Sequence, residues 1–436
     1  MNDRRIGLGG AVATLVGYVI GASIFVLPAE LLPSTGAGVV LAYLIAAIPA
    51  VFTCIVSAVL GNAFPVSGAS YVSVRDTLSP RIAFLTAWLI VVAAAIGAAL
   101  VAYGLADYAS YFWPSLSPRW CALIVVGAFI LLNLTSVTVA VAAQGAMVVL
   151  FVIVIAIFSA GGLVAGDWSR VSPLAPHGLG SVLTGAVAAY FSYAGLQVLI
   201  DIGGEVRDPQ RTIPRALALS FTVVLLLYLF FVLAVVLLSG DANEAQPGAL
   251  VGRLAERHFG PTLARGLVLS ALLAAATSIH GILFTQARDV NALALDGRLP
   301  SVIASPPGAI PRPAVVLLGA LALLATAVGA SIREYAVTTA MCMMAVQGVL
   351  GVAALRLPAR APDAWRASSF QLGPTKLMLA GGGLIVISAL FFVLAALQQP
   401  VSLMVFAVIV VAGVLASSRT ASVDTRRATG AGGGLS

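Results

Sequence analysis

The sequence predicts an all-α integral membrane protein with twelve transmembrane helices. Of its 436 residues, 61% are hydrophobic and only 9% are charged, whereas a soluble domain carries about 25% charged residues. The apolar residues gather in runs of membrane-spanning length. These runs lack the polar and apolar alternation of an outer-membrane barrel. The composition therefore excludes a soluble enzyme, a nucleic-acid-binding protein and a disordered chain.

Each predicted span holds roughly the 20 mostly apolar residues that cross a bilayer core. The first run continues without a small-residue cleavage site, so it is interpreted as a membrane helix and not as a signal peptide. Cys54, Cys121 and Cys342 lie inside apolar runs without the spacing of a disulfide or metal framework. The spans cover residues 7–32, 38–62, 82–109, 119–139, 143–165, 181–203, 213–238, 262–290, 314–331, 335–356, 377–397 and 399–417.

The distribution of basic residues predicts the orientation. With a cytoplasmic N-terminus, 17 of the 23 Lys and Arg residues fall on the inside, as the positive-inside rule expects. The net charge of +7 is thus explained by topology and needs no anionic partner. An even number of spans places both termini in the cytoplasm, and the polar tail at 418–436 is expected to be disordered.

The loops between the spans are too short for a nucleotide-binding domain, and no G-x-x-x-x-G-K-[ST] phosphate loop occurs. Transport driven by ATP is therefore not expected. Three classes remain: a gradient-driven or exchanging transporter, a channel or sensor, and an intramembrane enzyme. An enzyme would need a nucleophile with its base, or paired carboxylates, at membrane depth, and the sequence shows no such pair.

Two spans contain features that interrupt a helix. The first holds Gly17 and Gly21 at its centre, and the sixth holds the run from Phe191 to Gly195. Glycine costs about 1 kcal/mol relative to alanine inside a helix. Such residues serve either close helix packing or an unwound segment that lines a substrate site. Paired interruptions five helices apart favour an inverted-repeat transporter with a site at the midplane.

Four motifs carry a resemblance to a known family. They are the glycine-containing run from Gly17 to Pro28, the stretch from Phe64 to Val72, the E-V-R-D-P-Q-R-T-I-P run from Glu205 to Pro214, and the segment from Ala287 to Pro300. Together they resemble the amino acid-polyamine-organocation (APC) superfamily over residues 7–312. The last motif differs from the family pattern by an insertion.

The resemblance implies the LeuT-type fold. Residues 7–165 would form the first inverted repeat of five helices and 181–356 the second, with helices eleven and twelve at 377–417 outside them. Helices one and six would be interrupted. In such a fold the substrate is held by unwound backbone at the two breaks.

The resemblance also implies which residues bind substrate. The turn Gly21-Ala22-Ser23 would offer N–H groups to a carboxylate, helped by the positive end of the following half-helix. The carbonyls of Val19, Ile20, Phe191 and Ala194 would receive an ammonium group, and Ser192 would line the pocket. Ser23 replaces a usual glycine, so its hydroxyl either binds the carboxylate or narrows the pocket.

Several side chains are candidates for gating. Phe191 stands where family members place an aromatic lid, although a core or lipid-facing phenylalanine would give the same sequence. Tyr18 and Tyr193 are further candidates. Gln197 stands where some relatives carry an acidic gating residue, and its neutral amide argues against gating by titration.

No cofactor is expected, and the coupling ion is left open between sodium and a proton. Thr277 and Ser278, with the carbonyls of Gly17, Ile20 and Ala274, resemble the sodium ligands of this fold, but such hydroxyls also bond their own helix. His280 is either a proton carrier or a neutral packing residue. Phe151 replaces the coupling lysine of other members, and exchange without an ion is equally consistent.

The sequence thus predicts a secondary active transporter of the cell membrane, and no enzyme activity. The expected substrate is a neutral amino acid or small related amine, because mid-membrane charges are scarce and none is placed to hold a second ammonium group. A sodium-independent exchanger and a polyamine or cationic amino acid transporter are the alternatives. The lipid bilayer is the surrounding medium, no nucleic acid is expected, and the protein is a monomer or a homodimer.

Overall fold

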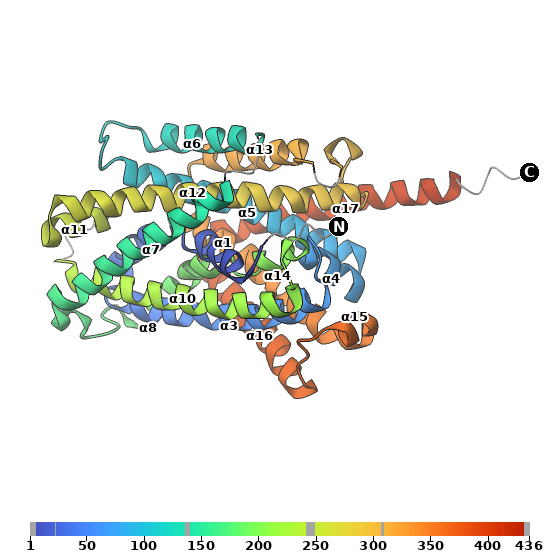
Figure 1. Cartoon of the computed structure of the whole chain (residues 1–436), viewed down its shortest axis with the longest axis horizontal. Coiled ribbons are helices and arrows are strands. Elements are labelled where there is room, and N and C mark those ends of the chain that lie inside the picture. The colour runs from blue at the N-terminus through green and yellow to red at the C-terminus, as the bar shows by residue number, and fades with distance from the viewer. Residues whose placement is uncertain (1–5, 22, 136–139, 241–248, 307–308, 431–436) are drawn as a thin grey trace, which may run out of the picture.

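The computed structural model describes residues 6–21, 23–135, 140–240, 249–306 and 309–430. Over this part of the chain the regular structure is helical, with two isolated backbone bridges, Ile6 with Val206 and Ser67 with Ile202. The all-α prediction is confirmed (Figure 1).

The helices follow one another as α1 (Leu8–Ile20), α2 (Ser23–Thr35), α3 (Gly38–Ala63), α4 (Ala69–Thr77), α5 (Pro80–Ala109), α6 (Pro118–Asn133), α7 (Ala140–Ala165), η1 (Trp168–Val171), α8 (Gly178–Ala189), η2 (Tyr190–Tyr193), α9 (Val198–Asp201), η3 (Gly203–Glu205), α10 (Pro209–Leu238), α11 (Leu250–Phe259), α12 (Pro261–Leu295), η5 (Ser301–Ile303), α13 (Arg312–Val328), α14 (Ile332–Arg360), α15 (Pro362–Ala367), α16 (Pro374–Gln398) and α17 (Pro400–Gly430).

Ten helical segments of the described chain are long and apolar enough to cross a membrane, counting α1 with α2 and α8 through α9 as one segment each. Two shorter apolar helices, α6 and α13, occupy the positions of the fourth and ninth predicted spans. The count of twelve and the inverted repeat stay predictions. Short helices α4, α11 and α15 lie in segments that were expected to be loops.

Local sequence explains where many helices begin. Proline occupies the first turn of α5, α6, α10, α12 and α16, where its missing N–H costs no helical hydrogen bond. At the start of α14, Ser331 and Glu334 form a reciprocal capping box, which satisfies two N–H groups that the helix leaves unpaired.

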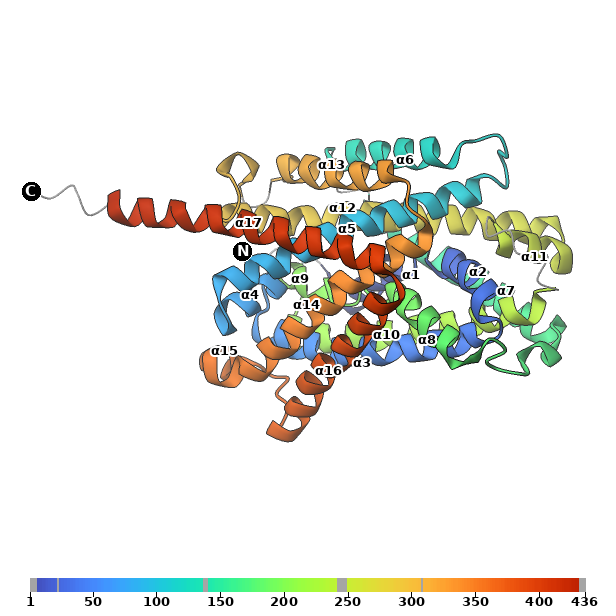
Figure 2. The ribbon, with the colours of Figure 1, turned by 180° about the vertical axis from the view of Figure 1, so that it is seen from behind.

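The helices form a bundle whose layers are clear in two opposite views (Figures 1 and 2). α6 and α13 lie side by side along one edge, next to α5 and α12, and α3, α8 and α16 form the opposite side. α1 lies inside the bundle, and α17 projects beyond it at its C-terminal end. The helix α17 reaches Gly430, where the sequence predicted a disordered tail from 418. Residues 417–429 contain no glycine or proline, so the sequence permits this continuation.

Both predicted interruptions are present. α1 ends at Ile20 and α2 begins at Ser23, and Gly21 between them has φ 41° and ψ −149°. On the sixth span, α8 ends at Ala189 and gives way to the single turn η2 and further turns before α9.

Two of the four family-like motifs meet in space at the end of the bundle that carries the start of α1. The Arg288 guanidinium lies 3.2 Å from the Glu205 carboxylate and 3.5 Å above the Phe284 ring. The backbone of Ile6 pairs with the same segment, because its N–H donates to the Glu205 carbonyl at 3.2 Å and its carbonyl accepts from Arg207 N–H at 2.8 Å. The segment after the second break is therefore bound to α12 by an ion pair and to the N-terminal segment by backbone hydrogen bonds.

Removing the charge of Glu205 should weaken this fastening. We expect Glu205→Gln to lower the free energy of unfolding by about 0.2–1 kcal/mol, the usual value of a solvent-accessible ion pair. Thermal unfolding of the purified protein in detergent measures the loss. Asp363→Asn is the matched control, because it breaks a more exposed pair with Arg366 inside the short helix α15. An equal loss in both variants would show that the Glu205 contact has no special structural role.

Candidate functional site

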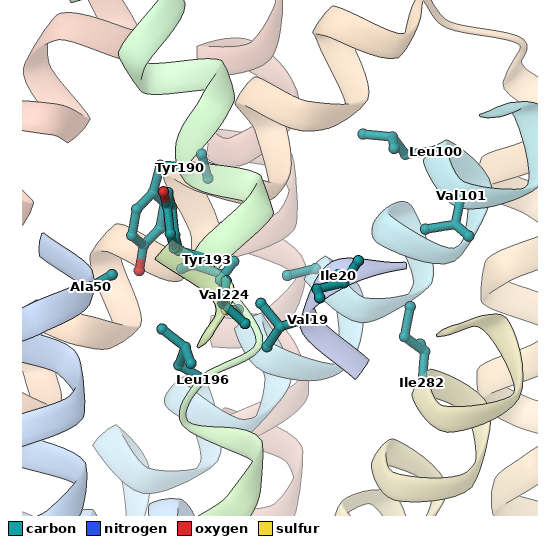
Figure 3. Packing of buried hydrophobic residues seen from close by; sticks show 14 of the residues in the cluster. Val19, Ile20, Ala50, Leu100, Val101, Tyr190, Tyr193, Leu196, Val224 and Ile282 are labelled. Carbon is teal, nitrogen blue, oxygen red and sulfur yellow. The ribbon is translucent and has the colours of Figure 1, made fainter. Parts of the chain in front are cut away.

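A cavity of about 60 Å³ lies between the two helix breaks. One water needs roughly 10–15 Å³ on the same scale, so the cavity holds a few waters. Figure 3 shows Val19 and Ile20 of the first break, with Val101 and Ile282 of α5 and α12 on one side and Tyr193 and Val224 on the other. The residues that line the cavity are Tyr18, Val19, Gly21, Ser23, Ile90, Ala93, Ala94, Gly97, Val101, Phe191, Ala194, Gly195, Gln197, Val198, Ser278, Ile282, Gln286, Thr339 and Met343.

The lining contains no Asp, Glu, Lys, Arg or His among the described residues. The cavity is mostly apolar, with a few hydroxyl and amide groups. The same part of the chain holds no cluster of three or more His, Cys, Asp or Glu that could bind a metal ion. The site therefore relies on backbone and neutral polar groups.

The first break is held against α12 by a close approach of backbone to side chain. A Cβ atom placed on Gly21 would overlap the hydroxyl of Ser278 and would lie 3.0 Å from the Ser278 Cβ. The positive φ of Gly21 also lies in a backbone region that residues with a side chain avoid. Glycine is therefore required here both by its conformation and by space.

Tyr228 of α10 joins the two breaks, and the sequence did not predict this role. Its hydroxyl oxygen lies 3.1 Å from the carbonyl oxygens of Val19 and Ser192 and 3.4 Å from that of Ile20. It also lies 2.9 Å from the hydroxyl oxygen of Ser23. A signal was available: Tyr228 is the only tyrosine within the predicted span 213–238, and a buried tyrosine hydroxyl usually finds a partner.

The Ser23 hydroxyl, expected to bind a carboxylate or to narrow the pocket, is engaged by the protein. It donates to the Ile20 carbonyl at 2.8 Å and pairs with Tyr228. A hydroxyl has a single proton to donate. The hydroxyls of Ser23 and Tyr228 thus supply two protons to the carbonyl oxygens of Val19, Ile20 and Ser192. These three oxygens therefore have spare acceptor capacity at the centre of the bundle.

The predicted substrate and gating residues divide into those that line the cavity and those that do not. Those that line the cavity are Tyr18, Val19, Gly21, Ser23, Phe191, Ala194 and Gln197. Ile20, Ser192 and Tyr193 are not part of the lining, and Ala22 lies outside the described residues. The roles of all these residues in binding and gating stay predictions.

Phe191 and Tyr193 occupy different surroundings. A Cβ on Gly97 of α5 would lie 3.3 Å from the Phe191 ring, so the ring packs closely against α5, and both residues line the cavity. Tyr193 is instead part of an aromatic cluster, with ring centroids 5.3 Å from Tyr228 and 6.4 Å from Tyr43. The carbonyl of Phe191, expected to be free, accepts from Ala194 N–H at 3.1 Å.

The ion-coupling candidates are only partly brought together. Ser278 Oγ lies 3.3 Å from each of the carbonyl oxygens of Gly17 and Tyr18, while Thr277 donates to Ala274 in its own helix at 2.9 Å. Ser278 is the only one of the proposed ligands that lines the cavity. His280 does not line it either, and its Nδ1 is buried without a partner in the described structure.

Two polar side chains of the sixth span, those of Asp201 and Gln197, are hydrogen-bonded within the protein. The Asp201 carboxylate accepts hydrogen bonds from Ser70 N–H at 2.8 Å and Ser70 Oγ at 3.0 Å, so it holds the first turn of α4. Gln197 Oε1 accepts from Gln347 Nε2 at 3.1 Å. Its own Nε2 lies 3.2 Å from the Met343 sulfur.

An all-helical membrane bundle with a neutral cavity at two broken helices defines a class of protein, the permeases that carry small molecules. The comparison with known proteins identifies the family. The chain belongs to the amino acid permease family, within the APC superfamily, and matches it over residues 6–415. Its members are transporters and not enzymes, and the chain is a multi-pass membrane protein.

Three relatives illustrate the range of the family. An uncharacterized transporter of Mycobacterium tuberculosis is 31% identical over 74% of this chain and 74% of its own length. The cationic amino acid transporter 9 of Arabidopsis thaliana, a chloroplastic protein, is 28% identical over 69% of this chain and 56% of its own. The branched-chain amino acid permease of Bacillus subtilis is 24% identical over 68% of each chain.

Proposed function

We propose that the protein is a secondary active transporter that moves neutral amino acids, or a small related amine, across the cytoplasmic membrane by alternating access. Both termini would face the cytoplasm, in keeping with the distribution of basic residues. One observation carries the proposal: a cavity without formal charge lies where two interrupted helices meet.

The backbone around the cavity offers both halves of a zwitterion site. The N-terminus of α2 at Ser23 presents N–H groups and the positive end of the helix dipole to a carboxylate. The carbonyls of Val19 and Ser192, which share the single proton of Tyr228, would receive an ammonium group. Backbone binding leaves the substrate's side chain to be selected by the remaining lining.

The absence of an acidic side chain from the described lining disfavours a polyamine or a cationic amino acid. A second ammonium group inside the bundle would need a counter-charge to offset its desolvation. The Phe191 ring could supply only a cation-π contact, worth about 0.5–2 kcal/mol. A relative is named for cationic substrates, so lysine and putrescine belong in the assay as competitors.

Uptake by the purified protein in proteoliposomes tests this proposal. We expect accumulation of labelled neutral amino acids and little competition from lysine or putrescine. Ser23→Leu should abolish uptake while the protein still elutes as a folded particle, because the larger side chain fills the cavity. Wild-type rates in Ser23→Leu would contradict the location of the site, and transport of polyamines alone would contradict the substrate class.

The same vesicles resolve the coupling mechanism. If Ser278 Oγ and the neighbouring carbonyl oxygens of Gly17 and Tyr18 bind sodium, uptake requires a sodium gradient and Ser278→Ala removes that requirement. If His280 carries a proton, an imposed pH gradient drives uptake and His280→Gln eliminates this response. Transport that ignores both gradients but accelerates with amino acid on the far side would identify an exchanger.

A further inference from the structure

The wall of the cavity formed by α14 differs from the rest of the lining. Thr339 and Met343 are one turn apart on this helix, and both face the cavity together with Gln197. We call Thr339, Met343 and Gln197 the α14 subsite, although Gln197 comes from the N-terminus of α9 and lies against α14. Much of the remaining lining on α5 and α12 is apolar, namely Ile90, Ala93, Ala94, Gly97, Val101 and Ile282.

The orientation of Gln197 is fixed from behind by a residue that is not part of the lining. Gln347 Nε2 donates to Gln197 Oε1 at 3.1 Å, so the amide oxygen points away and the NH₂ group points toward Met343. A thioether sulfur is a weak acceptor, and an amide nitrogen carries two protons. Gln197, which is 2% exposed, therefore presents donor capacity that the protein itself uses poorly.

Thr339 adds a second polar group on the same wall. Its side chain is 4% exposed, and its Oγ1 has no hydrogen-bond partner in the described structure. A buried hydroxyl without a partner costs free energy that a suitable ligand would recover. Gln286 Oε1 on α12 is a second buried and unpartnered polar atom of the described lining.

We propose that the α14 subsite selects a substrate whose side chain is polar and uncharged, bearing a hydroxyl or an amide. This inference rests on the transporter function proposed above and specifies its substrate. An amide or hydroxyl accepts from Gln197 Nε2 and exchanges a hydrogen bond with Thr339. An apolar side chain of the same shape leaves Thr339 Oγ1 unpaired and Gln197 Nε2 with only the weak sulfur acceptor of Met343, and a charged one finds no counter-ion. Gln347 acts as a positioning residue.

Competition between nearly isosteric amino acids tests the proposal in the proteoliposomes. Threonine should compete for uptake more strongly than valine, and asparagine more strongly than leucine. A site built to hydrogen-bond a substrate discriminates against the analogue that lacks the group. We expect ratios of roughly 5- to 100-fold, the range that follows from leaving a buried polar group unpaired.

Two variants isolate the subsite. Thr339→Val removes the hydroxyl, and Gln347→Met removes the bond that orients Gln197 while approximately preserving shape. Both should lower the threonine-to-valine ratio toward 1, because threonine loses its specific hydrogen bonds and valine has none to lose. General destabilisation would lower the uptake of both amino acids alike and leave the ratio unchanged. Thr326→Val is the control, since Thr326 is buried in α13 and bonds Ala322 in its own helix.

The outcomes separate this inference from the proposed function. Equal or stronger competition by valine and leucine would overturn the polar subsite, yet it would uphold amino acid transport. An unchanged ratio in both variants would also overturn it. Absence of any amino acid uptake would overturn both proposals. If Thr339→Val fails to fold, the wild-type ratios and Gln347→Met still decide the question.

Discussion

Gly21→Ala is expected to reduce transport to below about 1% of the wild-type rate. The added methyl group would overlap Ser278, and overpacking of this kind costs about 1–3 kcal/mol. The backbone at Gly21, with φ 41° and ψ −149°, lies in a region that residues with a side chain rarely adopt, which adds about 1–3 kcal/mol. Both costs fall on the turn that is proposed to contact the substrate carboxylate. Initial uptake rates in proteoliposomes measure the effect.

A matched glycine provides the control for this prediction. Gly382 lies in α16, and a Cβ there would meet open space. Gly382→Ala should therefore keep full transport and gain up to about 1 kcal/mol of stability, as expected for a helix interior. Wild-type uptake by Gly21→Ala would show that the first break tolerates a side chain, and the site assignment would fail.

Tyr228→Phe is expected to slow transport by roughly 10- to 100-fold and to lower thermal stability. The ring would keep its packing against Tyr43 and Tyr193, whose centroids lie 5.4 Å and 5.3 Å away. The hydroxyl would be lost, leaving the carbonyls of Val19 and Ser192 without this donor. Each buried group left unpaired costs about 1–3 kcal/mol.

Tyr193→Phe separates the hydroxyl bridge from ring packing. Its hydroxyl makes one hydrogen bond in the described structure, at 3.3 Å to the Tyr43 carbonyl, and does not bond to the break of the first span. We expect a much smaller effect on uptake and on the unfolding temperature. Equal losses in the two variants would indicate that the aromatic cluster, and not the link between the breaks, determines activity.

The positions of the ten long apolar segments of the described chain and of both breaks could be predicted from the sequence. Hydrophobic runs indicate where helices cross a membrane, and Gly21 and Gly195 mark where they are interrupted, whereas Gly17 lies within α1. The boundaries shifted where the pattern carries no hydropathy signal. α12, for example, continues to Leu295, beyond the predicted end of the span at residue 290.

The side-chain network of the site could not be predicted, because it depends on contacts between distant helices. Tyr228 lies more than 200 residues from Val19, and Gln347 lies 150 residues from Gln197. A single sequence gives no measure of such proximity. The carbonyls of Ile20 and Phe191 were expected to be free, but the structure shows each accepting a local hydrogen bond. The donors are the Ser23 hydroxyl and the Ala194 N–H, each three residues further along the chain.

The short backbone ladder between Ile6 and the segment from Glu205 to Arg207 has a mechanical consequence. Ile6, which precedes the N-cap residue Gly7 of α1, is joined there by backbone hydrogen bonds to the residues that follow the second break. A tilt of α1 at this end must therefore pull on the far half of the interrupted sixth span or first break the ladder. The two interrupted spans are thus mechanically coupled, and the two backbone hydrogen bonds of Ile6 are the point of coupling.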